Sequence, residues 1–215
     1  LASSAASDVY KRQTGSIEGV QNTGGICGFN DCHQTIENCY NTGNITGELE
    51  LGGICGSNAA NAIIKNCYNT GDVTGTDEEI GGIIGENSSI LVENCYNTGT
   101  VTNTGEDTDT VGAVCGWDKY KDVKNCYYLA DSETDKLDGT TFKTADQFAS
   151  GEVCYLLNGG KSDETVAFYQ TIGEDDYPVL DSTHGTVYQF TNCNQADTYT
   201  NNKDAKSGDL SLIHI

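Results

Sequence analysis

Short apolar segments recur through residues 14–130, separated by Gly, Asn and Thr rather than by long polar stretches. The hexapeptide Asn-Cys-Tyr-Asn-Thr-Gly occupies 38–43, 66–71 and 94–99, and a variant, Asn-Cys-Tyr-Tyr-Leu-Ala, occupies 125–130. These motifs begin 28, 28 and 31 residues apart. A fixed period of this length indicates a repeat architecture.

Each repeat contains two further short apolar segments. Glycine-flanked cells lie upstream of the motif, at 24–28, 52–56, 81–85 and 112–116, and Gly-x-Val-Thr-like segments lie downstream, at 43–47, 71–75 and 99–102. Strands this short cannot bury a face alone, whereas equivalent strands stacked about 4.8 Å apart bury a continuous core. We therefore expect an all-β fold, a parallel β-helix (β-solenoid) of about four three-stranded coils over 14–130.

Individual ladders can be predicted from the aligned repeats. Two residues before each motif cysteine stands a β-branched side chain that fits an inward stack: Ile36, Ile64, Val92 and Val123. The adjacent positions alternate in charge, which brings opposite charges together if they stack outward: Glu37, Lys65, Glu93 and Lys124. The first motif asparagines predict a ladder at a corner: Asn38, Asn66, Asn94 and Asn125.

This combination of a Gly-Gly-apolar-apolar-Gly cell, Asn-Cys-Tyr-Asn-Thr-Gly and Gly-x-Val-Thr-Gly resembles the GLUG-motif repeats of bacterial, Firmicutes-like cell-surface proteins, over about residues 14–128. The resemblance implies a β-helical region that is secreted or attached to the cell wall. Such repeats occur in IgA-specific metallopeptidases and in large multidomain surface proteins. They are accessory in that family, so the resemblance implies no catalytic residue.

Residues 140–190 look like the ending that often follows such repeats in surface proteins of gut Firmicutes, and the capping segment is expected to span 131–190. We expect a small α+β C-terminal cap with one or two short helices, because the last coil of a solenoid needs cover. Thr144 is a candidate N-cap with Gln147 three residues on, and a second helix is expected within 150–158, closed by Gly159 and Gly160. Residues 191–215 are expected to be a linker or the start of a next module.

Both ends carry sequence that resembles translated sequencing-adapter read-through, at 7–13 and at 210–215. We therefore expect 1–13 and 210–215 to be non-native, with the protein itself starting mid-repeat at about Thr14. Arg12, the only arginine of the chain, falls in the first of these segments.

The charge excludes two classes of partner. The formal net charge of the 215 residues is −21, whereas nucleic acid and anionic membrane surfaces require clustered Lys and Arg. No apolar run approaches the roughly 20 residues of a membrane span, so membrane insertion is not expected either.

The ten cysteines are interpreted as core residues rather than as disulfide-forming or reactive residues. Cys27, Cys55 and Cys115 share their repeat position with Ile84, which indicates a buried hydrophobe. The motif cysteines would stack with parallel side-chain vectors, a poor geometry for disulfides: Cys39, Cys67, Cys95 and Cys126. We expect reduced, buried thiols.

No metal or cofactor site is expected. Cys32-His33 occurs in the first coil alone and lacks a paired Cys-x-x-Cys. The acidic loops 77–79, 106–109 and 174–176 match no calcium-loop pattern, so solvated turns are the favoured interpretation over weak calcium binding.

Enzyme motifs are also missing, with no His-Glu-x-x-His, no Gly-x-Ser-x-Gly and no phosphate loop. A β-helical lyase acting on uronates would need cations to neutralise the substrate carboxylate, and this chain lacks arginine outside 1–13. A glycosidase would need two carboxylates about 5–10 Å apart, and the many acidic residues leave that alternative open.

The leading hypothesis is a non-catalytic extracellular repeat scaffold or stalk of a bacterial cell-surface protein, with an adhesive role as its extension. Its expected partners are neighbouring domains of the same polypeptide and a host or cell-wall glycan or protein. One alternative is an accessory region of a secreted hydrolase, an IgA-type metallopeptidase or a glycan-active enzyme, whose catalytic domain lies elsewhere. Another is carbohydrate binding by a tyrosine ladder, although a packed stack is favoured: Tyr40, Tyr68, Tyr96 and Tyr127.

Overall fold

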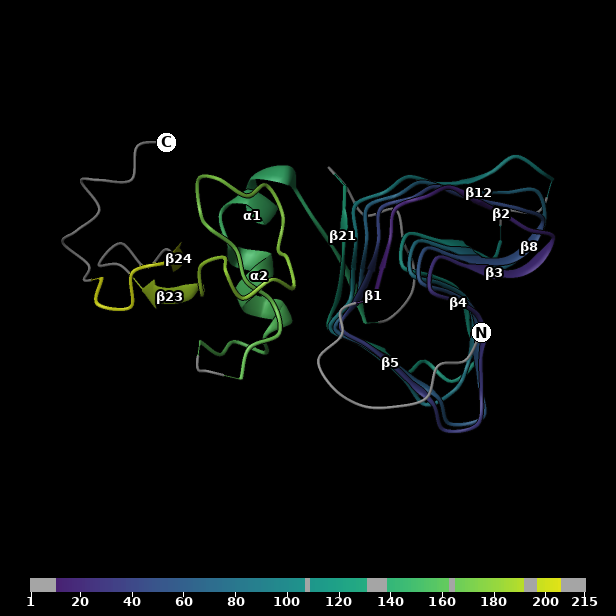
Figure 1. Cartoon of the computed structure of the whole chain (residues 1–215), viewed down its shortest axis with the longest axis horizontal. Coiled ribbons are helices and arrows are strands. Elements are labelled where there is room, and N and C mark those ends of the chain that lie inside the picture. Colours follow the sequence, from purple (N-terminus) through teal and green to yellow (C-terminus); the bar gives the residue numbers. More distant parts are fainter. Residues whose placement is uncertain (1–10, 107–108, 131–138, 163–164, 192–196, 206–215) are drawn as a thin grey trace. The chain divides into compact units, whose positions relative to one another are not determined.

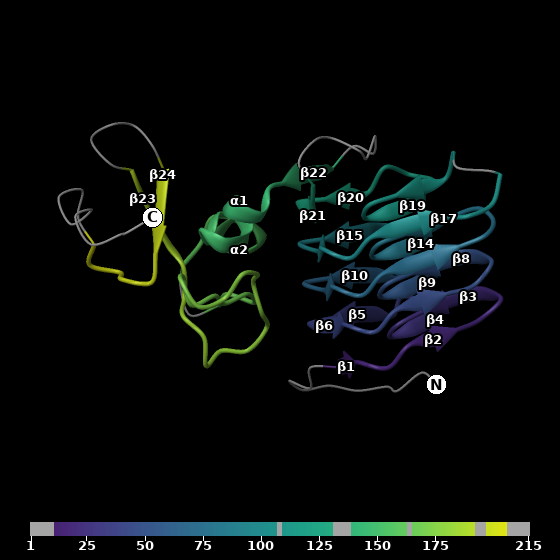
Figure 2. The ribbon, with the colours of Figure 1, turned by 90° about the horizontal axis from the view of Figure 1, so that it is seen from above.

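The computed structural model describes residues 11–106, 109–130, 139–162, 165–191 and 197–205. The chain divides into two compact units, residues 1–142 and 143–215. The first unit is a parallel β-solenoid. Figure 1 looks along its stack, so that equivalent strands overlie one another, and Figure 2 shows the coils side by side.

Five rows of parallel strands run along the stack. Row A consists of β1 (Lys11–Gln13), β6 (Cys39–Asn41), β11 (Tyr68–Asn69), β16 (Tyr96–Asn97), β21 (Cys126–Leu129) and β22 (Thr140–Lys143). Row B consists of β2 (Ile17–Glu18), β7 (Ile45–Thr46), β12 (Val73–Gly75) and β17 (Val101–Asn103). Row C consists of β3 (Gln21–Gly24), β8 (Leu49–Gly52), β13 (Ile80–Gly81) and β18 (Val111–Gly112). Row D consists of β4 (Cys27–Asn30), β9 (Cys55–Ala59), β14 (Ile84–Ser88) and β19 (Cys115–Asp118). Row E consists of β5 (Thr35–Glu37), β10 (Ile63–Lys65), β15 (Leu91–Glu93) and β20 (Val123–Lys124).

The solenoid of about four coils is therefore confirmed, but each coil has five short strands where three were expected. Two of the three apolar segments bend in the middle. The segment around each motif cysteine divides at its first asparagine, and the glycine-flanked cell divides between rows C and D. A bend inside an apolar run leaves the hydrophobic pattern unchanged, which is why the pattern alone did not show it.

The first motif asparagines form the expected corner ladder. Their φ angles of 53°, 52°, 52° and 49° lie in the left-handed region, which Asn tolerates better than most residues: Asn38, Asn66, Asn94 and Asn125. Asn94 Nδ2 donates to Asn66 Oδ1 at 3.2 Å, and Asn125 Nδ2 donates to Asn94 Oδ1 at 2.8 Å. The corner is thus held by both backbone geometry and inter-coil hydrogen bonds.

The core has two parts. The larger lies inside rows A, D and E and contains the predicted β-branched stack, in which Ile64 and Val92 are fully buried. The smaller lies inside rows B and C and consists of Ile45, Leu51, Val73 and Ile80. The charge alternation beside the larger core is also in register, and Lys65 Nζ lies 3.1 Å from Glu37 Oε1. Because both side chains are partly exposed, this ion pair contributes at most about 1 kcal/mol.

A second asparagine ladder, not predicted, runs through the interior. Asn41, Asn69 and Asn97, the second asparagines of the motifs, are 0%, 0% and 2% exposed. Asn69 Nδ2 donates to Asn97 Oδ1 at 2.9 Å and to the carbonyl of Gly71 at 2.7 Å, and Asn69 Oδ1 accepts from the N–H of Gly71 at 3.2 Å. Asn41 Nδ2 in turn donates to Asn69 Oδ1 at 2.8 Å. Buried amides are tolerated because each is satisfied by its neighbours.

A third ladder lies in row D. Asn30 Nδ2 donates to Asn58 Oδ1, Asn58 Nδ2 to Asn87 Oδ1, and Asn87 Nδ2 to Asp118 Oδ1, at 2.7, 3.1 and 2.9 Å. All three asparagines are buried. Asp118 ends this ladder and its other carboxylate oxygen accepts from the N–H of Val123 at 3.2 Å.

At the first coil, β1 pairs with β6 and places Lys11, Arg12 and Gln13 opposite Cys39, Tyr40 and Asn41. Gln13 Oε1 accepts from the N–H of Gly15 at 2.9 Å, as Asn41 Oδ1 accepts from that of Gly43 at 3.1 Å. The origin of segment 1–13 stays a prediction. Residues 1–10 and 210–215, on which the rest of that prediction falls, lie outside the described residues.

The second unit contains the predicted helices. α1 (Ala145–Ala149) begins with the expected capping box between Thr144 and Gln147, and α2 (Glu152–Leu157) is followed by Gly159 and Gly160 at φ 66° and 72°. A two-stranded antiparallel sheet, β23 (Tyr188–Thr191) and β24 (Asp197–Thr200), completes it. A capping role for 131–190 stays a prediction, and residues 131–138 of that segment lie outside the described part.

Candidate functional site

The predicted tyrosine ladder exists. Tyr40, Tyr68, Tyr96 and Tyr127 occupy one register position in row A. The rings of Tyr40 and Tyr68 stack with centroids 4.8 Å apart and planes 6° from parallel, and those of Tyr68 and Tyr96 with centroids 5.0 Å apart and planes 7° from parallel. Tyr68, Tyr96 and Tyr127 are only 7%, 0% and 7% exposed, and burial raises the pKa of Tyr68.

This geometry limits what the ladder can bind. The stacked rings turn their faces to one another, whereas a ring that stacks on a ligand needs an accessible face. Carbohydrate binding through Tyr40, Tyr68, Tyr96 and Tyr127 therefore stays a prediction that the stacking does not favour.

The motif cysteines form a second ladder beside the tyrosines. Each is buried and donates its Sγ–H to the carbonyl two residues earlier, at 3.1–3.2 Å: Cys39, Cys67, Cys95 and Cys126. Burial raises the pKa of the Cys95 thiol. The buried position of these side chains is as expected, and none of the nine cysteines in the described segments is in a disulfide.

Cys27 and Cys55 form the start of the other cysteine row, in register with Ile84 and Cys115. Cys55 is fully buried, whereas Cys27 in the first coil is half-buried. The neighbouring Cys55 thiol, which itself donates to the carbonyl of Ser57 at 3.1 Å, lowers the pKa of Cys27 to about 6. Cys27 thus differs from the buried members of the two rows in being partly exposed.

Cys32 and His33 lie exposed at the corner between rows D and E, at φ 56° and 64°. His33 Nε2 lies 3.4 Å from Asn61 Nδ2 of the next coil. The thiols of Cys27 and Cys39, the cysteines on either side of this pair in the sequence, donate to the carbonyls of Phe29 and Glu37. The structure does not bring these four side chains together as metal ligands; among the described residues, the cluster that could hold a metal is elsewhere.

That cluster is a trio of carboxylates from two coils: Glu50, Glu79 and Glu86, whose oxygens lie within 4.8 Å of one another. Glu50 lies on β8 and Glu79 is next to it in row C, just before β13. Glu86 lies on β14 in row D. Carboxylate oxygens are the ligands that Ca²⁺ and Mg²⁺ prefer, so this is where a hard cation could be held.

The trio is electrostatically strained. All three side chains are half-buried, and burial together with the carboxylates of Glu86, Glu50 and Glu78 raises the pKa of Glu79 to about 7. Glu86 Oε2 accepts from Ser57 Oγ at 2.7 Å, and Glu50 Oε1 accepts from Gln21 Nε2 at 3.2 Å. Glu50 and Glu79 also adopt left-handed φ angles of 54° and 62°, which cost about 1–2 kcal/mol each for a residue with a Cβ. Within the trio, Glu79 is therefore the carboxylate that takes up a proton near neutral pH.

A pH-dependent stability follows. The folded-state pKa of Glu79 lies above its unfolded value, so its protonated form stabilises the fold fully below about pH 4.5, and this contribution is lost as pH rises through 7. We expect Glu79→Gln to stabilise the solenoid unit at pH 8 by about 1 kcal/mol, a value reduced for partial exposure, and to flatten the pH dependence of unfolding between pH 5 and 8.

Urea denaturation at a series of pH values measures this effect, with the fluorescence of Trp117, the only tryptophan, reporting on the solenoid. Glu78→Gln is the matched control, since Glu78 is exposed beside Glu79, and it should change stability much less. Equal pH profiles for wild type and Glu79→Gln would contradict the raised pKa of Glu79.

Of the acidic loops, 77–79 contributes Glu79 to the trio while Asp77 and Glu78 are exposed. Residues 107 and 108 of the second loop lie outside the described residues. In the third, Asp175 Oδ2 accepts from the N–H of Thr171 at 2.6 Å and lies 2.7 Å from His184 Nδ1. The prediction of simple solvated turns is thus wrong for Glu79 and Asp175.

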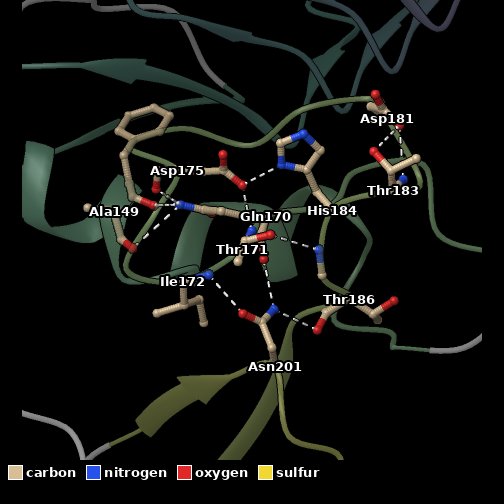
Figure 3. A network of polar contacts seen from close by, with 12 residues as sticks. Ala149, Gln170, Thr171, Ile172, Asp175, Asp181, Thr183, His184, Thr186 and Asn201 are labelled. Atoms are coloured by element: carbon tan, nitrogen blue, oxygen red, sulfur yellow. Dashed lines mark hydrogen bonds and ion pairs between the residues drawn. The ribbon is translucent and has the colours of Figure 1, made fainter.

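Asp175 belongs to a polar network of the second unit (Figure 3). Gln170, which is fully buried, donates through Nε2 to the carbonyls of Phe148 and Asp175 at 2.8 and 3.0 Å. Asn201 donates to the carbonyl of Gln170 at 2.7 Å and accepts from the N–H of Ile172 at 2.7 Å. These bonds join segments distant in sequence, so we interpret the Asp175–His184 pair as structural.

Sequence reasoning missed the trio although a signal was present. Glu50 and Glu79 both precede an apolar-Gly pair, so the aligned repeats already place them side by side. Glu86 could not be predicted in this way, because it approaches the other two from a different row.

In the described segments, neither helix is long and apolar enough to cross a membrane.

The stacked rows and the interior ladders define a β-solenoid built from short tandem repeats. Comparison with protein families identifies the repeat: the model described as the GLUG motif matches residues 47–74 and 77–102. These two segments, which run from β8 to β12 and from β13 to β17, are GLUG-motif repeats. Comparisons with curated proteins and with solved structures returned no match.

Proposed function

We propose that this chain is a non-catalytic extracellular repeat scaffold of a cell-surface protein. The scaffold holds neighbouring domains of the same polypeptide, and as an extension of this role it adheres to a glycan or a protein. The observation that carries this proposal is the stacking itself. Every row continues in register through the coils, and inward positions repeat the same kind of residue, so each coil contacts mainly its neighbours. Such a fold offers a rigid and regular surface.

The alternative of an accessory region in a secreted hydrolase shares this scaffold and differs only in what adjoins it. Sequencing the complete gene separates the two, because a metallopeptidase or glycan-active domain on the same polypeptide would favour the alternative.

The scaffold proposal predicts that the solenoid tolerates an added coil. Duplicating residues 66–93 inserts one repeat in register, and we expect a folded protein whose Trp117 unfolding midpoint is unchanged or higher, since one more interface between coils is formed. Circular dichroism and urea denaturation measure this. If the inserted repeat prevents folding, this contradicts the proposal that each coil contributes to stability independently and additively.

The extracellular placement needs a separate test. Protease treatment of intact cells of the source organism should remove the solenoid epitope from the cell surface without lysis of the cells. An epitope that is protected until lysis would overturn the placement and leave the scaffold proposal standing.

A further inference from the structure

Two cysteines at the start of row D lie side by side on neighbouring strands. Cys27 on β4 is paired in register with Cys55 on β9, and both side chains pack in the larger core. Each thiol donates to the carbonyl two positions later, at 3.2 Å for Cys27 and 3.1 Å for Cys55. Because those two carbonyls belong to paired residues as well, the side chains share one orientation. Their sulfur atoms therefore lie one strand spacing apart, about 4.8 Å.

The two thiols form a separate pair. The pKa of the Cys27 thiol is lowered chiefly by the thiol of Cys55, so the two groups are in contact. On the other side of Cys55 the next residue of the row is Ile84, and the series of thiols stops there. The motif cysteines continue through four coils and are all buried, whereas Cys27 is partly exposed. Cys27 and Cys55 are thus two sulfur ligands, one of which reaches solvent.

The spacing selects the kind of cation that fits between them. Two metal–sulfur bonds of about 2.3 Å, placed end to end, span about 4.6 Å, which matches the separation of the two sulfur atoms. Side chains stand roughly perpendicular to their sheet, so a cation midway between the sulfurs meets each Cβ–Sγ bond at close to a right angle. A cation that accepts two ligands in a line can therefore be held without movement of either strand.

Other cations fit less well. Zn²⁺ takes four ligands in a tetrahedron, and the group of three or more candidate ligands that the described segments contain is the carboxylate trio, which includes neither thiol. Hard cations such as Ca²⁺ prefer the oxygen ligands of that trio. Soft thiolate ligands instead select Cu⁺ and cations of similar chemistry, such as Ag⁺.

We propose that Cys27 and Cys55 bind a soft, linearly coordinated monovalent cation of the Cu⁺ type between β4 and β9. The cation replaces the proton of the Cys27 thiol, which passes to solvent, and accepts a lone pair from the Cys55 sulfur. Cys55 keeps its proton and its hydrogen bond to the carbonyl of Ser57, and neither sulfur nor metal changes oxidation state. One positive charge enters and one proton leaves, so the site stays neutral, as the full burial of Cys55 requires.

Silver ion tests the proposal, because Ag⁺ shares this chemistry and needs no reducing agent. The complete, reduced chain is loaded with silver nitrate in chloride-free buffer. Gel filtration with a small excess of N-acetylcysteine then removes Ag⁺ from single thiols, and mass spectrometry counts the silver retained. We expect Cys27→Ser and Cys55→Ile each to retain one cation fewer than wild type; isoleucine already occupies this row at residue 84. Any silver held by the buried motif cysteines is common to all variants and cancels in the comparison.

The double variant distinguishes one shared cation from two separate ones. Cys27→Ser combined with Cys55→Ile should also retain one cation fewer than wild type, whereas two independent thiol sites would lose two. Cys32→Ser is the matched control and should leave the count unchanged. Cys32 is exposed in the same coil, but Ala60 stands at the equivalent position of the next coil.

X-ray absorption should show two sulfur neighbours for each silver ion retained, and an excess of Zn²⁺ should displace none. Circular dichroism checks that the variants fold, and Cys27→Ser, at the partly exposed position, remains decisive if Cys55→Ile does not. An equal silver count in wild type and Cys27→Ser, a loss of two cations in the double variant, or displacement by Zn²⁺ would overturn the proposal.

Discussion

Replacing Asn69 by leucine is expected to lower the free energy of unfolding of the solenoid unit by about 3–5 kcal/mol. Leucine has similar size but removes all the hydrogen bonds of the fully buried amide. The Nδ2 of Asn41 and the Oδ1 of Asn97 each lose an inter-coil partner, and a buried polar group left unpaired costs about 1–3 kcal/mol. Urea denaturation followed by Trp117 fluorescence measures the change.

Asn44→Leu is the matched control, because Asn44 is exposed and its Oδ1 accepts a single hydrogen bond, from the N–H of Asp72 at 3.1 Å. We expect it to cost less than about 1 kcal/mol. A similar small cost for Asn69→Leu would show that the interior amide ladder does not stabilise the stack.

Replacing Gly71 by alanine should destabilise the solenoid unit by about 3 kcal/mol or more, or prevent its folding. The new Cβ would lie 2.1 Å from the carbonyl oxygen of Gly43, and the two coils are held together next to this contact by the hydrogen bond from the N–H of Thr70 to the carbonyl of Asn41 at 3.0 Å. Relief requires the two coils to separate, which opens the core on both sides. The same urea denaturation experiment measures the loss.

The chain supplies a control at the equivalent position. Gly15 begins this row of glycines, and a Cβ there would meet only the Oε1 of Gln13, at 3.6 Å. Gly15→Ala should therefore be nearly neutral. If both alanines cost the same, close backbone approach between coils is not the reason for glycine at Gly71.

The interior asparagines and a second set of glycines require one another. The missing Cβ atoms of Gly25, Gly53 and Gly82 would lie 2.7, 2.3 and 2.4 Å from the Cγ atoms of Asn41, Asn69 and Asn97. The last repeat changes both members, with Ala113 at the glycine position and Tyr128 opposite Asn97. Tyr128 therefore ends the amide ladder, and its ring packs at 6.5 Å from that of Phe142.

The sequence was sufficient for the periodic part of this fold. The stacks of Ile36 and Ile64, of the motif cysteines and of Asn66 and Asn94 follow from a 28-residue period, because register converts sequence spacing directly into contact. The number of strands per coil did not follow. The number of strands depends on the left-handed backbone at Asn38 and its equivalents. An asparagine in the sequence permits such a bend, but its presence does not show that the chain bends there.

The candidate sites were less predictable for a different reason. Tyr68 and Tyr96 were expected to stack, but the orientation of their ring faces is a three-dimensional property. Asn69 was one letter of a motif, and its burial became evident only once Gly53 was seen against its amide. The carboxylates of Glu79 and Glu86 meet because rows C and D lie against each other, which no spacing between repeats encodes.

The five-row coil has a consequence for distance. A fully extended segment of 28 residues would span about 90 Å, whereas the same residues wound into one coil advance the stack by about 4.8 Å. This fold is therefore poorly suited to spanning long distances and well suited to setting a distance in small steps. Each repeat gained or lost would displace the segment that follows it by one strand spacing. Most residues of a repeat make the coil wide and rigid, and few of them add to its length.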